Sequence, residues 1–242
     1  VAGRVARNPA LAGVRELRCW EHPGTDALGP LLGGPAFAAL TLLEVYNLAL
    51  LGAPRTLPLL GANPRCRALE RLRLTGYAIG TPELAALAAS GGWANLRELR
   101  LGGGAVAPDA PGVLGRANGG RLESLSLRRN GLTGLRGLGG PGLNTLRSLD
   151  LSGNRSLPPS ALAELTGRAP GLRHLDLSDC YLMDDTAAEL IAGSPAFATL
   201  HQLDLIHCAV GPDGAVALAE SPHLRDRLTL HLHDCPLGDK GK

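Results

Sequence analysis

Three aspartates, Asp150, Asp176 and Asp204, stand at the same place in successive copies of a short pattern, Leu-Asp-Leu. If each copy is a strand of one parallel sheet, the carboxylates form a column with neighbours about 4.8 Å apart. Each neighbouring pair would repel by roughly 1 kcal/mol in water, or about 3.5 kcal/mol at an effective dielectric constant of 20. A hydrophobic core needs no such column, so we expect it to meet a basic partner or a cation. The alternative is a column of solvated carboxylates that binds nothing.

Histidine is the second chemical feature, because six of the seven histidines lie beyond residue 173. His231 and His233 are two residues apart and should project from one face of a strand, where they could meet Asp204 or His207. Such a cluster could bind zinc, or it could make association depend on pH near the imidazole pKa. Surface histidines without a defined set of ligands are more often incidental, so we predict no metal site and no cofactor.

The five cysteines are an odd number, and no pair has the short Cys-x-x-Cys spacing of a zinc site. Cys180, Cys208 and Cys235 fall at equivalent places in successive patterns, which predicts a buried, reduced stack of small apolar side chains. This cysteine usage predicts a reducing, cytoplasmic compartment.

Motifs of common catalytic sites are absent: there is no Gly-x-x-x-x-Gly-Lys-Ser/Thr, His-Glu-x-x-His or Gly-x-Ser-x-Gly. The net charge of +2 gives no bulk electrostatic reason to bind nucleic acid or an anionic membrane. No apolar run approaches the roughly 18 residues of a membrane helix, and residues 1–9 lack the apolar segment of a secretory signal. We therefore predict a protein that is not an enzyme and has no nucleic-acid or membrane partner.

Leucine dominates the apolar composition, with 50 leucines against 8 valines and 3 isoleucines. When one apolar side chain dominates the composition, the same kind of packing site must recur many times in the core. Aligning the chain on Leu-x-x-Leu-x-Leu-x-x-(Asn/Cys)-x-Leu gives nine registers, spaced 24 to 29 residues apart. They start near residues 14, 40, 69, 96, 122, 146, 172, 200 and 227, and they are degenerate at both ends of the chain.

The spacing within a register predicts a short strand, because two leucines two residues apart face one side and their neighbours face solvent. The Asn or Cys that follows turns inward, and we expect Asn130 and Asn154 to hydrogen-bond neighbouring loops. Apolar stretches of helical period predict helices over 81–87, 159–165, 184–190 and 212–218. The connector over 134–142 has five glycines in nine residues and predicts an irregular or 3₁₀ crossing. A helix is wider (~10 Å) than the strand spacing (~4.8 Å), so the sheet must lie on the inner side of a curve.

This pattern resembles the leucine-rich repeats of the ribonuclease-inhibitor-like class over about residues 11–242, and the units near 192–200 and 219–224 are similar to multi-repeat bacterial proteins of that class. The resemblance implies an α/β solenoid, a horseshoe of about nine repeats, with a parallel sheet on the concave face and helices on the convex face. We expect one such domain over residues 1–242, which could be a fragment of a longer chain. Leu-Asp-Leu-Ser is a common form of this repeat, which favours the solvated alternative for the aspartate column.

The side chains that face solvent on the predicted strands form the candidate binding surface, and their chemistry changes along the chain. The first two strands carry aromatic residues that should be neighbours, and such pairs often anchor interfaces. A missing N-terminal cap or repeat could cover this aromatic pair instead. The middle strands are basic, and the last ones are acidic with histidines. The candidate residues are Trp20, Tyr46, Arg71, Arg73, Arg100, Arg128, Arg129, Asp150, Asp176, Asp204, His231 and His233.

We predict a scaffold that binds another protein on this concave face, with the arginines meeting an acidic patch and the aspartates a basic one. The resemblance implies scaffolds more often than enzymes, but a fold does not fix a function. One alternative is the sensor or substrate-recruiting arm of a larger effector, such as a ubiquitin ligase or an immune receptor. Another is a structural spacer with no partner.

Overall fold

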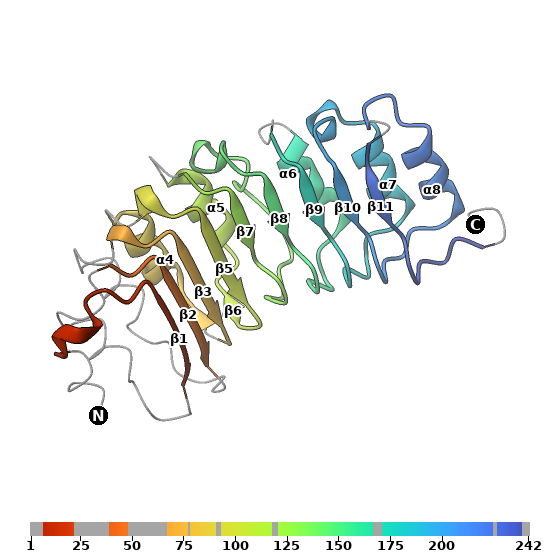
Figure 1. The fold of residues 1–242 in the computed structure, drawn as a ribbon. Coiled ribbons are helices and arrows are strands. Elements are labelled where there is room, and N and C mark those ends of the chain that lie inside the picture. Colours follow the sequence, from red (N-terminus) through yellow and green to blue (C-terminus); the bar gives the residue numbers. More distant parts are fainter. Residues whose placement is uncertain are drawn as a thin grey trace.

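A computed structural model describes residues 7–21, 39–47, 67–76, 78–90, 93–117, 121–166, 171–224 and 227–238. In these residues nine strands form one parallel sheet whose order follows the chain (Figure 1). Each strand begins two residues after a predicted register start. The strands are β1 (Glu16–Glu21), β2 (Leu42–Asn47), β3 (Arg71–Thr75), β5 (Glu98–Gly102), β7 (Ser124–Ser126), β8 (Ser148–Asp150), β9 (His174–Asp176), β10 (Gln202–Asp204) and β11 (Thr229–His231).

Helices and 3₁₀ turns carry the chain back between strands and cover one face of the sheet, which makes an α/β solenoid as predicted (Figure 1). A small parallel ribbon of β4 (Ala78–Ile79) and β6 (Ala105–Val106) follows β3 and β5. None of the helices in the described ranges is both long enough and apolar enough to cross a membrane. The helices are α4 (Thr81–Ala88), α5 (Ala110–Arg116), α6 (Ala163–Thr166), α7 (Asp185–Ala192) and α8 (Pro212–Ala219), and the 3₁₀ turns are η1 (Pro9–Leu11), η3 (Trp93–Asn95), η4 (Pro141–Leu143), η5 (Pro159–Leu162) and η6 (Pro195–Phe197).

Three of the predicted helices, over 81–87, 184–190 and 212–218, match α4, α7 and α8. The fourth, over 159–165, is divided into η5 and α6. The prediction named no helix at α5, because Pro111, Gly112 and Gly115 weaken its helix signal.

The glycine-rich connector over 134–142 contains only turns and the start of η4, as predicted. Gly137, Gly140 and Gly142 of this connector lie against α5 and the residue that follows it. A Cβ on Gly115 would fall 1.8 Å from the Gly137 carbonyl oxygen, and a Cβ on Gly140 would fall 2.1 Å from the Gly115 oxygen. The backbones of α5 and of the connector are therefore in direct contact at this point of the convex side, with no side chains between them.

The core is a row of leucines that repeat with the strands. Leu72, Leu99, Leu125, Leu175 and Leu203 are the second residues of their strands, are paired in register with their neighbours and are completely buried. Full burial of each such side chain contributes about 1.5–3 kcal/mol. Because the same site is rebuilt in each repeat, the concave side chains are held in rows across the sheet.

The inward-turning Asn residues tie the repeats together as predicted. The Asn154 side chain is fully buried, accepts from the backbone N–H groups of Asn130 and Leu132, and donates to the Leu127 and Leu151 carbonyls. Asn130 donates in the same way to the Leu101 carbonyl one repeat earlier. Each amide therefore satisfies backbone groups of a neighbouring repeat.

Cysteines continue this ladder in the later repeats. The thiols of Cys180, Cys208 and Cys235 donate to carbonyls one repeat back, at Sγ to O distances of 3.4, 3.1 and 2.9 Å, and none of them forms a disulfide. Burial raises the pKa of the Cys180 thiol to about 12 and also raises the pKa of Cys208. The predicted stack of equivalent cysteines is seen at these positions, buried at Cys180 and Cys208 and half-buried at Cys235, whereas Cys66 lies outside the described residues.

Candidate functional site

The concave surface begins with an aromatic pair on β1 and β2. Trp20 is paired in register with Tyr46, and their rings stack with centroids 4.5 Å apart and an interplanar angle of 19°. The predicted neighbourhood of these rings is confirmed. Trp20 is 67% exposed, which is unusual for so large an apolar side chain. The Tyr46 hydroxyl donates to Glu44 Oε1 at 2.9 Å, and this hydrogen bond, together with burial, raises the pKa of Tyr46.

Arginines and glutamates form an ion-pair network beside this stack. Arg71 pairs with Glu16 at 2.9 Å, an N to O distance across two strands, and Arg18 pairs with Glu44 at 3.1 Å. Arg73 lies between Glu44 and a further glutamate on β5.

Glu98 on β5 is the centre of that network, because it accepts from both Arg73, at 2.8 Å, and Arg100. Burial acts to raise the pKa of Glu98, but the two guanidinium groups outweigh burial and lower it. The expectation of a uniformly basic middle is therefore corrected: Arg71, Arg73 and Arg100 are already matched by glutamates of this face. The signal was present in the sequence, since Glu16, Glu44 and Glu98 occupy concave positions of the same strands.

Arg128 and Arg129 follow β7 and are exposed, and neither forms an ion pair with any residue in the described ranges. Arg129 has φ 54°, in the left-handed region that few non-glycine residues adopt. The same repeat position has positive φ in all seven described repeats from β3 onward. Its occupants are Gly76, Gly103, Arg129, Gly153, Asp179, His207 and Asp234.

The aspartate column lies on the concave side as predicted, but its members differ in how their charge is met. Asp150 accepts from the Ser126 hydroxyl at 2.8 Å and from the Ser152 N–H and hydroxyl. Asp176 accepts from the Ser178 N–H at 2.9 Å. Burial and the flanking carboxylates of Asp150 and Asp204 raise the pKa of Asp176 despite this hydrogen bond, which agrees with the expected repulsion.

Asp204 is not solvated, so the expectation that this carboxylate faces water is wrong. It is only 6% exposed because the imidazoles of His174 and His231 converge on it from both neighbouring strands, with His174 Nε2 at 2.8 Å. Gln202 Nε2 donates to it as well, at 2.9 Å. Burial acts to raise the pKa of Asp204, but these hydrogen bonds outweigh burial and lower it.

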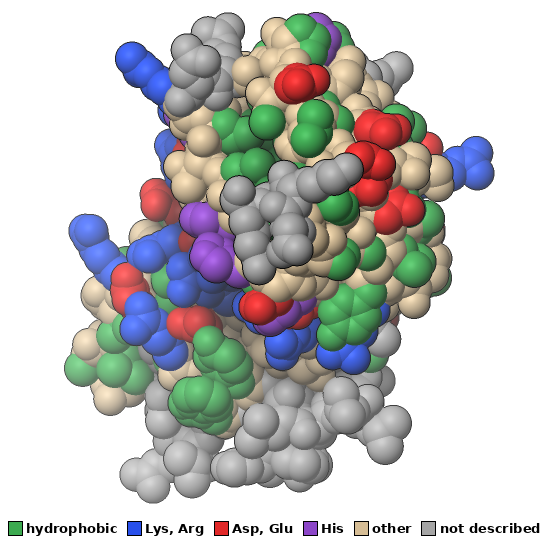
Figure 2. All heavy atoms as spheres, turned by 90° about the vertical axis from the view of Figure 1, so that its right-hand side faces the viewer, with side chains coloured by type: hydrophobic (Ala, Val, Ile, Leu, Met, Phe, Trp, Pro, Cys, Tyr) green, Lys and Arg blue, Asp and Glu red, His purple; other side chains and the backbone are tan. Residues whose placement is uncertain are grey.

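The contact expected between His231 and Asp204 is confirmed, and the His231 and His233 rings lie 6.0 Å apart. His207 instead lies between two other carboxylates, with 3.1 Å from Nδ1 to Asp179 and 3.1 Å from Nε2 to Asp234. Seen from the C-terminal end, histidines adjoin both basic and acidic side chains (Figure 2). Over the described ranges, no group of three or more histidine, cysteine and acidic residues is placed to hold a metal ion.

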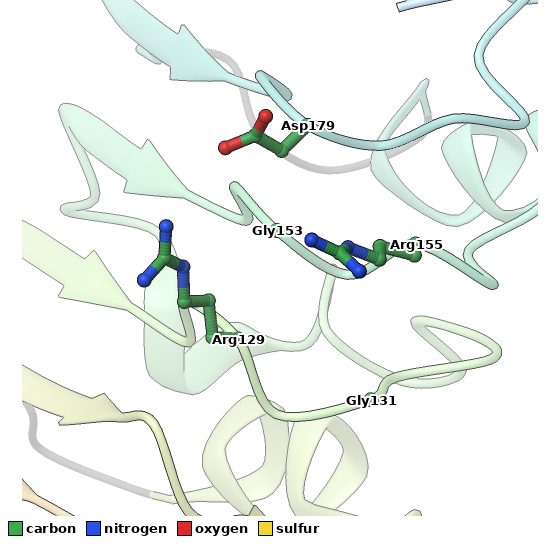
Figure 3. Close-up of a pocket in the computed structure, with 5 residues that line it drawn as sticks. All are labelled: Arg129, Gly131, Gly153, Arg155 and Asp179. Atoms are coloured by element: carbon green, nitrogen blue, oxygen red, sulfur yellow. The ribbon is translucent and has the colours of Figure 1, made fainter. Parts of the chain in front are cut away.

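A cleft of about 340 Å³, which the repeat pattern did not predict, lies where the chain turns after β7, β8 and β9. Arg129 and Arg155 point into it from successive loops, with Asp179 on the next loop (Figure 3). Gly131 and Gly153 line the remainder. Arg155 lies outside the repeated concave positions, so the strand pattern gave no reason to include it.

Two segments of the chain match the family described as leucine-rich repeat, over residues 145–165 and 198–219. No curated protein matches the sequence.

Solved structures with this fold are similar over most of the chain. A chain of the Rad7 and Elc1 complex from yeast has 20% identity and a TM-score of 0.62, with 91% of this chain and 55% of that chain covered. Internalin inlF from Listeria monocytogenes has 16% identity and a TM-score of 0.51, with 88% and 65% covered. A chain of the TLR13–ssRNA13 complex has 18% identity and a TM-score of 0.52, with 90% and 28% covered.

The chain thus spans between about a quarter and two thirds of the length of these structural relatives. The likeness at this level of identity concerns the fold. Taken with the nine-stranded parallel sheet, its leucine rows and the two matched segments, it leads to one conclusion: this chain is a leucine-rich-repeat protein.

Proposed function

We propose that this protein is a non-enzymatic scaffold that binds a protein partner on its concave sheet face. The observation that carries the proposal is the stacked pair of Trp20 and Tyr46, because Trp20 is 67% exposed on a strand face that lies outside the leucine core. Exposed aromatic residues in a rigid arrangement are typical anchors of protein interfaces. The parallel sheet holds both rings at fixed positions, so binding would cost little ordering entropy.

The charges of this face suggest the chemistry of the partner. Arg128 and Arg129 are available for an acidic patch, whereas Arg71, Arg73 and Arg100 would have to exchange one carboxylate for another and would contribute little net affinity. Asp176 would be relieved by a basic group, because its ionised form is disfavoured between two other carboxylates. At the far end, His231 and His233 would contact the partner, with Asp204 behind His231 as a supporting residue. Asp150, which is held by Ser126 and lies three strands away from His231, would be a supporting residue of the aspartate column.

A protein partner is preferred over nucleic acid for an electrostatic reason. The net charge is only +2, and three concave arginines are already neutralised by glutamates. One structural relative belongs to a complex with single-stranded RNA, so a labelled RNA oligonucleotide is the appropriate competitor. We expect no RNA binding that survives 150 mM salt.

A second candidate is the recognition arm of a larger assembly, such as a ubiquitin ligase or an immune receptor. It is favoured by the likeness to a chain of the two-protein Rad7 and Elc1 complex, of which this chain spans 55%.

We also propose a cytoplasmic location, because the thiols of Cys180 and Cys208 are buried and form no disulfide. The convex helices, such as α7 and α8, support a further proposal, that the protein belongs to the ribonuclease-inhibitor-like class.

Site-specific photo-crosslinking tests the concave-face proposal. A crosslinker replaces Trp20 in one variant and Val216, an exposed apolar residue of α8, in the matched control. We expect one partner to crosslink from position 20 and not from position 216, and the paired change Trp20→Ala, Tyr46→Ala to weaken that partner at least tenfold. A partner that crosslinks equally from both positions, or that binds the paired variant with unchanged affinity, would contradict the proposal.

A further inference from the structure

The cleft after β7, β8 and β9 is lined by two arginines and one aspartate. Within the described ranges, Arg129 and Arg155 take part in no ion pair, although Arg71, Arg73 and Arg100 all do. The one carboxylate in the cleft, Asp179, is already engaged by His207 Nδ1 at 3.1 Å. The cleft therefore presents an excess of guanidinium groups to a ligand (Figure 3).

Both arginine side chains contact neighbouring groups of the protein. The Arg155 guanidinium carbon lies 5.0 Å from the centre of the Tyr181 ring, a cation–π contact that orients the group. The stem of Arg129 lies across Gly153, where a Cβ would come within 2.5 Å of Arg129 Cγ. An arginine that is already positioned loses less side-chain entropy when it binds an anion.

The backbone at Arg129 distinguishes it from the residues at the same place in the two adjacent repeats. Its φ of 54° is easy for glycine, and glycine occupies the equivalent place at Gly76, Gly103 and Gly153. Asp179, His207 and Asp234 adopt the same positive φ in later repeats, so the conformation belongs to the repeat turn, but an arginine here carries a conformational cost that Gly103 and Gly153 in the adjacent repeats avoid. No ion pair with described residues offsets that cost.

We propose that Arg129 and Arg155 form a binding site for an oxyanion, a phosphate monoester or a carboxylate, carried by a segment of the protein partner. Guanidinium groups bind both anions through paired, charge-assisted hydrogen bonds. A cleft of about 340 Å³ exceeds a single anion and accommodates the side chain that bears it. Two guanidinium groups match the charge of about −1.5 to −2 on a phosphate monoester better than that of a carboxylate. The protein source of the anion rests on the proposed function, whereas the anion site does not.

Fluorescence anisotropy with three labelled Gly/Ser peptides tests the site and separates the two sources of the anion. The peptides are identical except for a central phosphoserine, glutamate or serine. We expect the phosphoserine peptide to bind, the glutamate peptide to bind about tenfold more weakly, and the serine peptide not to bind. Equal affinity for the glutamate and phosphoserine peptides would assign the site to acidic segments, and equal affinity for all three would overturn the proposal.

Substitutions then locate the site. Arg129→Gln and Arg155→Gln should each weaken the phosphoserine peptide about tenfold, whereas Arg121→Gln, the same charge change at an exposed arginine before β7, should change affinity less than twofold. Tyr181→Leu should weaken binding two- to threefold, and Tyr181→Phe, which keeps the ring, should not. Equal losses in Arg121→Gln and Arg129→Gln would show diffuse charge attraction and overturn the assignment.

The substitution Arg129→Gly distinguishes a binding role of Arg129 from a structural role. We expect it to weaken the phosphoserine peptide about tenfold while raising the melting temperature, since glycine relieves the strained φ. Loss of both affinity and melting temperature would mean that Arg129 supports the fold instead. The paired change Trp20→Ala, Tyr46→Ala should leave peptide binding unchanged, so failure of the concave-face proposal and failure of this one are distinguishable.

Discussion

Across β1, β2 and β3 the central concave position carries alternating charges, Arg18, Glu44 and Arg73, whereas across β8, β9 and β10 it carries three aspartates. In the first region long side chains reach sideways and pair with each other. In the second region short side chains of like charge cannot pair.

In the second region, serine and imidazole groups therefore donate hydrogen bonds to the aspartates, where the first region pairs arginines with glutamates. Asp150 is satisfied by serines and Asp204 by imidazoles, and among the described residues Asp176 between them accepts only from Ser178. Behind the sheet, the same later repeats use buried Asn and Cys side chains to satisfy the backbone. The comparison indicates that the stability of the first region responds to salt and that of the second to pH.

The largest expected effect concerns the ladder behind the second region. Asn154→Ala removes an amide that satisfies four buried backbone groups, so we expect the free energy of unfolding to fall by about 3 kcal/mol. Cys180→Ala removes one thiol hydrogen bond and should cost about 1 kcal/mol. Urea unfolding followed by circular dichroism measures both, and equal losses would argue against a special role for the amide.

Asp204→Asn should lower the free energy of unfolding by about 2 kcal/mol at pH 7, because both imidazoles lose their charged acceptor. The pKa of Asp204 is lower in the folded state, so its contribution is present above the unfolded value near 4 and is lost as the pH falls through the folded value. The variant should therefore approach the native protein in stability at pH 2 to 3. Asp213→Asn, at an exposed site on α8, is the control, and a similar loss there would refute the explanation.

Glu98→Gln tests the first region. It removes the shared charge between Arg73 and Arg100 and should cost about 1 kcal/mol at pH 7, less in 1 M salt. The pKa of Glu98 is lowered in the folded state, so this difference should also vanish at acid pH. Glu123→Gln breaks a more exposed pair with Arg97 and should change stability by less than about 0.5 kcal/mol. Thermal melts at two salt concentrations distinguish these outcomes.

The smallest expected effect has the opposite sign. The pKa of Asp176 is raised in the folded state, so its ionised form is penalised, and the penalty appears as the pH rises from about 4 through the folded value. Asp176→Asn should therefore stabilise the protein by about 0.5 kcal/mol at pH 7 and have no effect at pH 3. If the column contacts a basic partner, the same change should weaken that partner. A destabilised variant with unchanged affinity would contradict both expectations.

Local periodicity predicted the architecture well. All nine strands of the sheet lie where the leucine spacing predicts them. A leucine every two or three residues indicates a short strand with one buried face, and each repeat forms the same strand. The inward Asn and Cys positions follow from the same register. Helices were predicted less well where glycine and proline are frequent: none was predicted at α5, and the helix predicted over 159–165 is divided into η5 and α6.

The sequence by itself determined the solenoid, the order of its strands and which side chains share the concave face, since these depend on spacing along the chain. Only the tertiary structure decided which of those side chains contact one another. It pairs Arg73 with Glu98, closes two imidazoles over Asp204 and brings Arg155 beside Arg129. The reason is physical: spacing fixes where each Cα lies in the sheet, but side-chain length and the curvature between repeats fix which charged ends meet.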